Sequence, residues 1–143
     1  MNNIKIKKLT ENAIIPSYQT SGASGCDLHS TEEYFLKSGE IYIFSTGLIL
    51  EIPAGFEGQI RPRSSIACRY GITVVNSPGT IDNDYRGEVK VGLINLSLDD
   101  YLILAGDRIA QLIFAKVEQG TFEEITEVKQ TERGEGGFGS TGK

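Results

Sequence analysis

The sequence has few of the residues that build metal clusters and covalent frameworks. It holds two cysteines, Cys26 and Cys68, and a single histidine, His29, among 143 residues. Two cysteines do not make a disulfide framework, so we interpret them as free thiols in a reducing cytosol. No cysteine–histidine cluster has the spacing of a zinc site. These shortages exclude the disulfide-rich and zinc-ligated classes of small domain.

Long hydrophobic runs are also missing, and positive charge is in deficit. No run of about eighteen apolar residues occurs, so we expect no membrane span. The N-terminal stretch MNNIKIKKLTENA carries lysines but no apolar segment, so we expect no signal peptide. The formal net charge is −5, whereas general binding to DNA or RNA needs a basic face. We therefore expect no nucleic-acid partner, no membrane, and a cytoplasmic location, or a nuclear one in a eukaryotic or viral source.

What the chain does have is the size and composition of one globular domain. Its 143 residues are 39% hydrophobic and 23% charged, which suits a soluble domain that buries roughly 68–70% of its unfolded surface. The apolar pattern stops near Lys129. We therefore expect a β domain over residues 1–128 and a C-terminal arm over residues 129–143.

Short apolar runs separated by glycines predict a mostly β structure. Apolar and other residues alternate along 88–93, which is typical of a half-buried strand. One helical turn is expected over 64–70, with serine at the cap position and Gly71 at the stop. Many short strands at close spacing favour an all-β sandwich or barrel with one short helix. The expected strands are 41–44, 48–52, 72–75, 88–93, 101–104 and 109–117.

The last eleven residues, RGEGGFGSTGK, cannot form a core, because five of them are glycine. Glycine-rich backbone can close its N–H groups around an anion. Arg133 adds positive charge, Ser140 and Thr141 add hydroxyl donors, and Phe138 offers a flat face for a ring. We interpret this segment as a mobile strap that orders over a phosphorylated, base-containing ligand. The alternative is a disordered, solubilising tail, in which Phe138 would have no use.

Two motifs near polar turns can each be interpreted in two ways, as ligand-binding residues or as purely structural ones. SGASGCDLHS places Asp27 just after a glycine-rich turn, where it is either a ligand or a turn residue that caps its own backbone. RPRSSIA places Arg63, Ser64 and Ser65 at an expected helix start. These residues suit a phosphate, or they form a plain N-cap pair beside a surface arginine.

Two further motifs are similarly ambiguous. NSPGTIDNDYRGEV lies between two β runs, and a hairpin there would present backbone groups able to read the edge of a flat base. Asp82 and Asp84 are alternatively simple turn residues. AGDRIAQLI places Gln111 inside an apolar strand, where it either needs a polar partner or lies on the solvent face of an edge strand.

In chain order, these motifs together resemble the five motifs of the trimeric deoxyuridine triphosphatase family, which hydrolyses dUTP to dUMP and pyrophosphate. The resemblance extends from about residue 21 to residue 142. It implies an all-β jelly roll assembled as a homotrimer, in which each active site takes residues from all three subunits and the arm of one subunit closes over it. The matching segments are SGASGCDL, RPRSSIA, NSPGTIDNDYRGEV, AGDRIAQLIF and RGEGGFGSTG.

The same resemblance implies a role for individual residues. Asp82 matches the general base that positions a water for attack at the α-phosphorus, Tyr85 the ring that excludes a 2′-hydroxyl, and Asp27 the acid that holds Mg²⁺ through water. Carboxylates can take a proton from water, and Mg²⁺ keeps several waters while it neutralises phosphate charge. The implied substrate contacts are Asn76, Gly79, Thr80 and Ile81 for uracil, Arg63, Ser64, Ser65 and Gln111 for the phosphates, and Arg133, Phe138, Gly139, Ser140 and Thr141 in the arm.

Two related activities remain as alternatives. The dCTP deaminase branch shares the fold but carries a catalytic glutamate where this chain has Gly92, and it lacks the glycine strap. A nucleotide-binding regulator of the same fold would bind a nucleotide or a protein partner without turnover. A plain structural β domain would leave all five motifs unexplained. The sequence therefore predicts a Mg²⁺-dependent dUTP diphosphatase.

Overall fold

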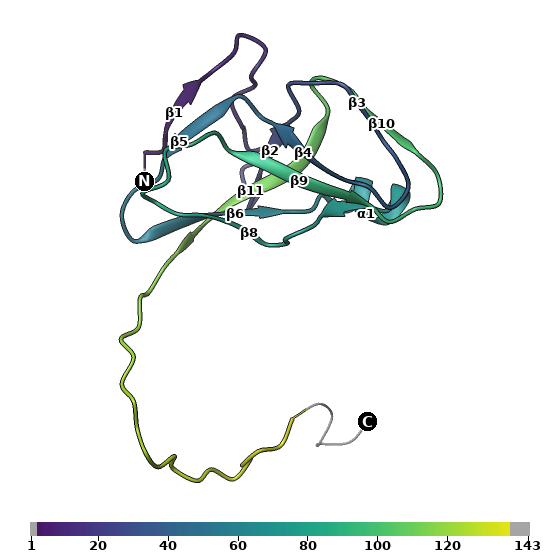
Figure 1. Ribbon diagram of the computed structural model, residues 1–143. Coiled ribbons are helices and arrows are strands. Elements are labelled where there is room, and N and C mark those ends of the chain that lie inside the picture. The colour runs from purple at the N-terminus through teal and green to yellow at the C-terminus, as the bar shows by residue number, and fades with distance from the viewer. Residues whose placement is uncertain (1–2, 138–143) are drawn as a thin grey trace.

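The structure is a computed structural model in which residues 3–137 are described. It consists of short strands and one helix, followed by a long C-terminal extension (Figure 1). The strands are β1 (Lys5–Lys8), β2 (Cys26–His29), β3 (Tyr34–Leu36), β4 (Ile41–Ser45), β5 (Leu48–Glu51), β6 (Phe56–Arg61), β7 (Ile72–Val74), β8 (Gly79–Ile81), β9 (Lys90–Asn95), β10 (Tyr101–Ile103) and β11 (Arg108–Lys116), and the helix is α1 (Ser64–Tyr70).

The strands pair antiparallel in four small sheets. The largest has the order β2-β11-β6-β8, and the next has the order β4-β9-β7. Two-stranded ribbons, β1-β5 and β10-β3, complete the described body. The predicted all-β class with one short helix is confirmed.

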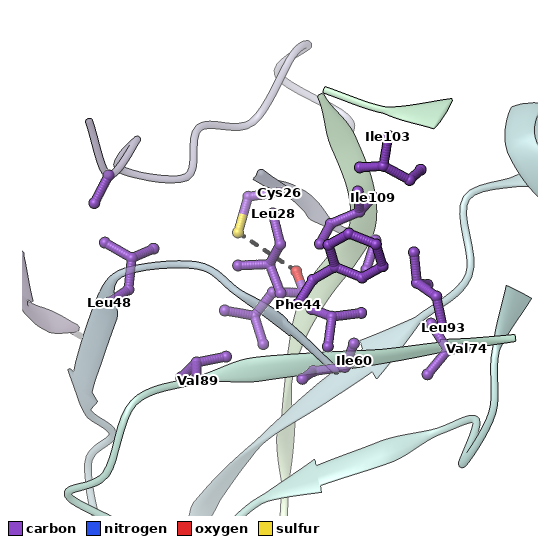
Figure 2. Close-up of a cluster of buried hydrophobic side chains, with 14 of the residues drawn as sticks. Cys26, Leu28, Phe44, Leu48, Ile60, Val74, Val89, Leu93, Ile103 and Ile109 are labelled. Atoms are coloured by element: carbon purple, nitrogen blue, oxygen red, sulfur yellow. Dashed lines mark hydrogen bonds between the residues drawn. The ribbon is translucent and has the colours of Figure 1, made fainter. Parts of the chain in front are cut away.

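One hydrophobic core joins these sheets. Leu28 of β2, Phe44 of β4, Leu93 of β9 and Ile109 of β11 are all fully buried and belong to the same cluster (Figure 2). Each such side chain contributes about 1.5–3 kcal/mol by leaving water. Burial of side chains from both larger sheets therefore holds the sandwich closed and fixes the loops at its surface.

The expected helix occurs over the predicted residues, but its N-terminal cap is different. The N-cap residue is Arg63, with φ −91° and ψ 128°, and it makes no side-chain capping hydrogen bond. Ser64 is therefore the first helical residue, and the expected serine cap is wrong. Gly71 ends the helix with φ 70°, a left-handed conformation that glycine adopts without strain.

The expected hairpin is more complicated than a simple turn. β7 and β9 pair as predicted, with Val74 opposite Leu93. Between them, however, β8 leaves this sheet and pairs with β6, with Thr80 opposite Gln59. The connection therefore bridges the two larger sheets, and Asp82 follows directly after β8.

Beyond β11 the chain leaves the body. Val117 donates its N–H to the carbonyl of Gly55 at 3.0 Å, and residues 118–137 form neither helix nor strand. Figure 1 shows this extension trailing away from the sheets. Phe122 and Val128 on it are 103% and 83% exposed. Four predicted arm residues, Phe138, Gly139, Ser140 and Thr141, lie outside the described residues.

Candidate functional site

The predicted uracil and catalytic residues share one cavity of about 410 Å³. It opens between β8 and the sheet that contains β4, β7 and β9. The structure brings together six predicted residues there, with apolar walls formed by Ile41, Ile43, Val75 and Val91. The six are Asn76, Gly79, Thr80, Ile81, Asp82 and Tyr85. We call this the hairpin cavity.

Asp82 lies on the rim of the hairpin cavity, where β8 ends. Its backbone carbonyl accepts the N–H of Tyr85 at 3.2 Å, so a tight turn follows it. The Asp82 residue is exposed, and none of the ion pairs formed within residues 3–137 includes it. Its carboxylate is thus free to accept a proton from a water in the cavity.

The backbone of β8 forms the floor of the hairpin cavity. Gly79 is buried, and a Cβ there would lie 3.2 Å from the Nδ2 atom of Asn76. A side chain at position 79 would therefore press against the amide of Asn76. Peptide groups and one amide at the same edge provide donors and acceptors of the kind that a flat base requires.

Gly92 supplies only backbone to the wall of the hairpin cavity. A Cβ at this position would lie 3.1 Å from Cγ1 of Val75, so the wall is already close-packed. No carboxylate stands where the deaminase branch carries its glutamate. The geometry therefore does not favour the deaminase alternative.

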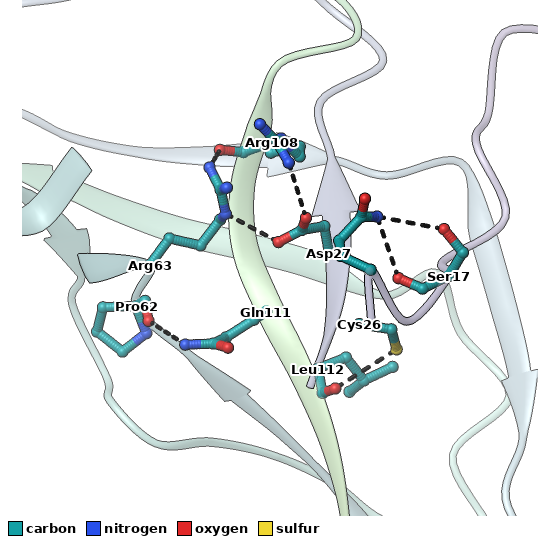
Figure 3. Close-up of polar contacts among 9 residues, drawn as sticks. Ser17, Cys26, Asp27, Pro62, Arg63, Arg108, Gln111 and Leu112 are labelled. Atoms are coloured by element: carbon teal, nitrogen blue, oxygen red, sulfur yellow. Dashed lines mark hydrogen bonds and ion pairs between the residues drawn. The ribbon is translucent and has the colours of Figure 1, made fainter. Parts of the chain in front are cut away.

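The predicted phosphate and metal residues share a second, more polar cavity of about 300 Å³. Asp27 comes from β2, Gln111 from the neighbouring β11, and Arg63 from the segment between β6 and α1 (Figure 3). Ser64 and Ser65 are the first two residues of α1. Asp27 lies opposite Gln111 in the sheet register. The lining residues are Gln19, Gly25, Asp27, Arg63, Ser64, Ser65, Arg108 and Gln111. We call this the polar cavity.

Asp27 holds two arginines in the polar cavity. Its Oδ1 lies 2.8 Å from Nε of Arg63, and its Oδ2 lies 3.4 Å from Nη1 of Arg108. The side chains of Asp27 and Arg63 are only 11% and 18% exposed. The interpretations of Asp27 as a turn cap and of Arg63 as a surface residue are therefore wrong. Each guanidinium has five N–H donors, so several remain for an anion.

Gln111 lies in a central strand, because β11 is flanked by β2 and β6. Its Nε2 donates to the carbonyl of Pro62 at 2.8 Å. A Cβ on Gly25 would lie 2.9 Å from its Oε1. The edge-strand interpretation is therefore wrong, and Gln111 has the polar partner that a half-buried amide requires.

Arg108 is a lining residue that the sequence reasoning missed. It stands three positions before Gln111 in the same motif, and its carbonyl also accepts Nη1 of Arg63 at 3.1 Å. Its position beside an expected phosphate ligand was the available signal. Arg108 makes the polar cavity a site of two cations around one carboxylate.

His29 lies next to this charged group, opposite Arg108 in the register. Its Nδ1 atom is buried without a hydrogen-bond partner. Burial lowers the pKa of His29 below its usual value, because it disfavours the imidazolium form. The negative charge of Asp27 opposes this lowering, whereas Arg108 and Arg63 add to it.

The polar cavity offers a metal ion one carboxylate, that of Asp27, and no complete set of protein ligands among residues 3–137. Residues 3–137 contain no group of three or more histidine, cysteine, aspartate or glutamate side chains that could hold a metal. Both oxygens of Asp27 are engaged by arginines. The residues therefore fit a Mg²⁺ whose remaining ligands are water and phosphate oxygens, which is a common arrangement for this ion.

Among the residues that the structure describes, 3–137, the two cavities have no lining residue in common. The described part of the arm reaches neither of them. Arg133 instead donates its Nε to the carbonyl of Gly136 at 2.8 Å, within a local turn on the extension. The structure thus brings the predicted residues together in two groups of one protomer and leaves the arm separate.

Comparison with known proteins gives the family of the chain. A family model described as dUTPase matches residues 11–142. The deoxyuridine 5′-triphosphate nucleotidohydrolase of Nautilia profundicola is 56% identical over 140 residues, which cover 98% of this chain and 99% of that protein. The enzyme of the same name from Helicobacter hepaticus is 54% identical over 140 residues, with coverage of 98% and 89%.

Solved structures agree with this match. The dUTPase of Staphylococcus bacteriophage 80alpha with dUpNHpp superimposes with a TM-score of 0.92 at 26% identity, over 99% of both chains. The expected jelly-roll β fold is thereby confirmed. Two curated relatives at more than half identity and a family match over almost the whole sequence leave one conclusion: the chain belongs to the dUTPase family.

Proposed function

We propose that this chain hydrolyses dUTP to dUMP and pyrophosphate as a homotrimer. The observation that carries the proposal is the split of the motif residues between two separate cavities in a member of the dUTPase family. A protomer with the base-reading half and the phosphate-binding half apart needs a neighbour to complete a site. In a cyclic trimer, the hairpin cavity of one subunit meets the polar cavity of the next.

In this site the hairpin cavity binds uracil and deoxyribose. The backbone of residues 79–81 and the amide of Asn76 read the edge of the base, and Tyr85 packs under the sugar. Its ring leaves no space for a 2′-hydroxyl. The 80alpha relative has been solved with the nucleotide analogue dUpNHpp, which supports a nucleotide ligand for this fold.

The chemical step rests on Asp82. Its exposed carboxylate orients a water and takes its proton while the water oxygen bonds to the α-phosphorus. The bond from that phosphorus to the bridging oxygen then breaks, and pyrophosphate leaves. Arg63, Ser64, Ser65 and Gln111 bind the phosphate oxygens, because phosphoryl transfer needs positioning and charge neutralisation above all.

Asp27 would hold Mg²⁺ through a water molecule. The ion, when bound, supplies further neutralisation of the phosphate charge. A mutant dUTPase from phage phi11 of Staphylococcus aureus has a structural Mg(II) ion, which shows that a relative of this fold binds the metal. The engaged oxygens of Asp27 favour indirect ligation.

The arm over residues 129–143 closes the site of neighbouring subunits. Arg133 contacts the terminal phosphate, Phe138 stacks on uracil, and Gly139, Ser140 and Thr141 contact the phosphates. A base–aromatic stack contributes about 1–3 kcal/mol. Ordering each arm residue costs about 1–2 kcal/mol, so the phosphate contacts must supply the remainder.

The decisive experiment measures pyrophosphate release from dUTP, dCTP, dTTP and UTP, with ammonia release from dCTP in parallel. We expect dUTP to be the preferred substrate. Asp82→Asn should keep binding of dUpNHpp while kcat falls by about 10²–10⁴-fold. Asp84→Asn is the matched control, since Asp84 belongs to the same loop but does not line the hairpin cavity.

Three outcomes separate the alternatives. Ammonia release from dCTP would identify a deaminase. Tight binding of dUpNHpp without turnover by the wild-type protein would identify a regulator. An Asp82→Asn variant with the wild-type rate would show that another group activates the water.

A further inference from the structure

The ring of Tyr85 lies back over its own loop. Residues 82–89 connect β8 to β9, and the hydroxyl of Tyr85 donates to the carbonyl of Glu88 at 3.1 Å. A Cβ on Gly87 would lie 2.5 Å from Cζ and 2.9 Å from Cε2 of this ring, and closer still to the hydroxyl oxygen. The ring therefore occupies the space that any side chain at position 87 would need.

The acceptor of this hydrogen bond is itself fixed. The carboxylate of Glu88 accepts the N–H of Gly47 at 2.8 Å. Val89 donates its N–H to the carbonyl of Leu48 at 2.8 Å, and its own carbonyl accepts the hydroxyl of Thr46 at 2.5 Å. Thr46, Gly47, Leu48 and Val89 are buried. The Tyr85 hydroxyl is thus linked through Glu88 to the corner between β4 and β5, which these hydrogen bonds hold in place.

Position 87 requires a glycine because of the space that the Tyr85 ring occupies, and not because of the backbone conformation there. Its φ lies outside the left-handed region, so the backbone would accept an alanine without strain. The three heavy atoms nearest to such a Cβ all belong to the Tyr85 ring and its hydroxyl, so the collision is with that side chain. Ordinary contacts of a Cβ atom fall at 3.4–4 Å, so an alanine would have to move the ring by about 1 Å.

We infer that Gly87 is a positioning residue that sets the preference for deoxyribose over ribose by fixing the height of the Tyr85 ring in the hairpin cavity. This inference rests on the proposed function, in which Tyr85 lies under the sugar. A ring that excludes a hydroxyl by shape discriminates by no more than about 10²-fold. A displacement of the Tyr85 ring by about 1 Å is therefore enough to change the preference for dUTP over UTP.

The test compares kcat and KM for dUTP and UTP in the wild-type protein and in Gly87→Ala. We expect kcat/KM for dUTP to fall by about 10- to 100-fold. The ratio of kcat/KM for dUTP over UTP should fall by roughly tenfold, because the displaced ring no longer excludes the 2′-hydroxyl. Gly120→Ala is the control, since a Cβ there meets nothing within 4 Å and both parameters should stay unchanged.

A second arm of the experiment separates positioning from general structure. In a Tyr85→Ala background the ring is absent, so Gly87→Ala should change the dUTP-over-UTP ratio no further. The double variant also removes the collision, so it should fold even where the single variant does not. Tyr85→Phe keeps the ring and loses only the hydrogen bond to Glu88, so its ratio should fall by less than that of Gly87→Ala.

Two results would overturn the inference alone. One is a folded Gly87→Ala variant that keeps the wild-type ratio, and the other is an equal drop of the ratio with and without the Tyr85 ring. A wild-type protein that releases no pyrophosphate from dUTP would overturn the proposed function as well, so the two failures are distinguishable.

Discussion

The two cavities of the protomer differ in the chemical groups that line them. The hairpin cavity combines backbone groups with apolar walls, and Asp82 on its rim has no ion-pair partner within residues 3–137. The polar cavity is built around a carboxylate held between two arginines. The first suits the shape and hydrogen-bonding edge of a base, and the second suits the charge of phosphates. Within residues 3–137 neither contains both sets of groups, which supports the proposal that the protomer carries two half-sites.

The surface near the hairpin cavity indicates where the polar cavity of a neighbouring subunit would dock. Ile41 and Ile43 line this cavity and are 53% and 61% exposed. Exposed apolar residues beside a functional cavity are typical of a surface that a partner covers. We expect a neighbouring subunit to cover them and to present its polar cavity there.

The largest effect is expected when one half-site is disabled in each of two variants. Asp82→Asn damages the hairpin cavity, and Arg63→Gln damages the polar cavity. Each homotrimer should lose about 10²–10⁴-fold of its activity. In mixed trimers from equal co-expression, however, a site is intact whenever an Arg63 variant supplies the hairpin and an Asp82 variant supplies the phosphate contacts. This combination occurs at about one quarter of the sites in a cyclic trimer, so about one quarter of the wild-type pyrophosphate release should return.

The mixing experiment needs two controls. Mixing either variant with itself should restore nothing, and the mixed trimers should have the mass of the wild-type trimer. If both cavities served one site within a single protomer, mixed trimers would stay as inactive as the parents. That result would refute the division into half-sites.

A smaller loss is expected when the arm is removed, because both half-sites stay intact. Deleting residues 133–143 takes away one stack of about 1–3 kcal/mol and charge-assisted hydrogen bonds of about 1.5–3 kcal/mol each. After the ordering cost, kcat/KM for dUTP should fall by about 10²–10³-fold. The thermal midpoint should hardly change, since among residues 3–137 the last backbone hydrogen bond to the body is that of Val117.

A milder variant sharpens the same comparison. Phe138→Leu removes the stack and keeps the phosphate contacts, so its kcat/KM should lie between the wild type and the truncation. Binding of dUMP should change little in either protein, because the monophosphate lacks the terminal phosphates. A truncated trimer with the wild-type rate would show that the arm has no part in closure.

The sequence predicts the apolar strands well, because burial leaves a pattern in the residues. The predicted runs 41–44, 48–52, 101–104 and 109–117 correspond to β4, β5, β10 and β11. β6 was missed although its sequence FEGQIR alternates, because a glycine at its centre replaces an apolar side chain and weakens the strand pattern. Its Gly58 packs so closely that a Cβ would lie 3.1 Å from Leu112, a requirement set by tertiary contact and invisible in local pattern.

The candidate site was predictable as a list of residues but not as an arrangement. The motifs indicated Asp27 and Arg63 separately, because spacing along the chain says nothing about a pair 36 positions apart. Their ion pair forms because β2, which carries Asp27, and β6, which precedes Arg63, both pair with β11. The crossing of β8 from the sheet of β7 and β9 to the sheet of β6 had no local signal either. The role of each residue in the reaction stays a prediction.

The smallest expected effect concerns His29, which lies beside the polar cavity. Because its folded-state pKa is lowered, the unfolded chain binds the proton more tightly. Stability should therefore be full above the ordinary histidine value near 6.5, fall as the pH drops from there through the folded pKa, and level off below it. The chain has no other histidine, so His29→Asn removes this contribution entirely. Between pH 7.5 and pH 5 the thermal midpoint of the variant should fall less than that of the wild type, by on the order of 1–2 °C. Carboxylate titration affects both proteins alike, so equal slopes would show that burial of the His29 imidazole beside Asp27 and Arg108 carries no pH-dependent cost.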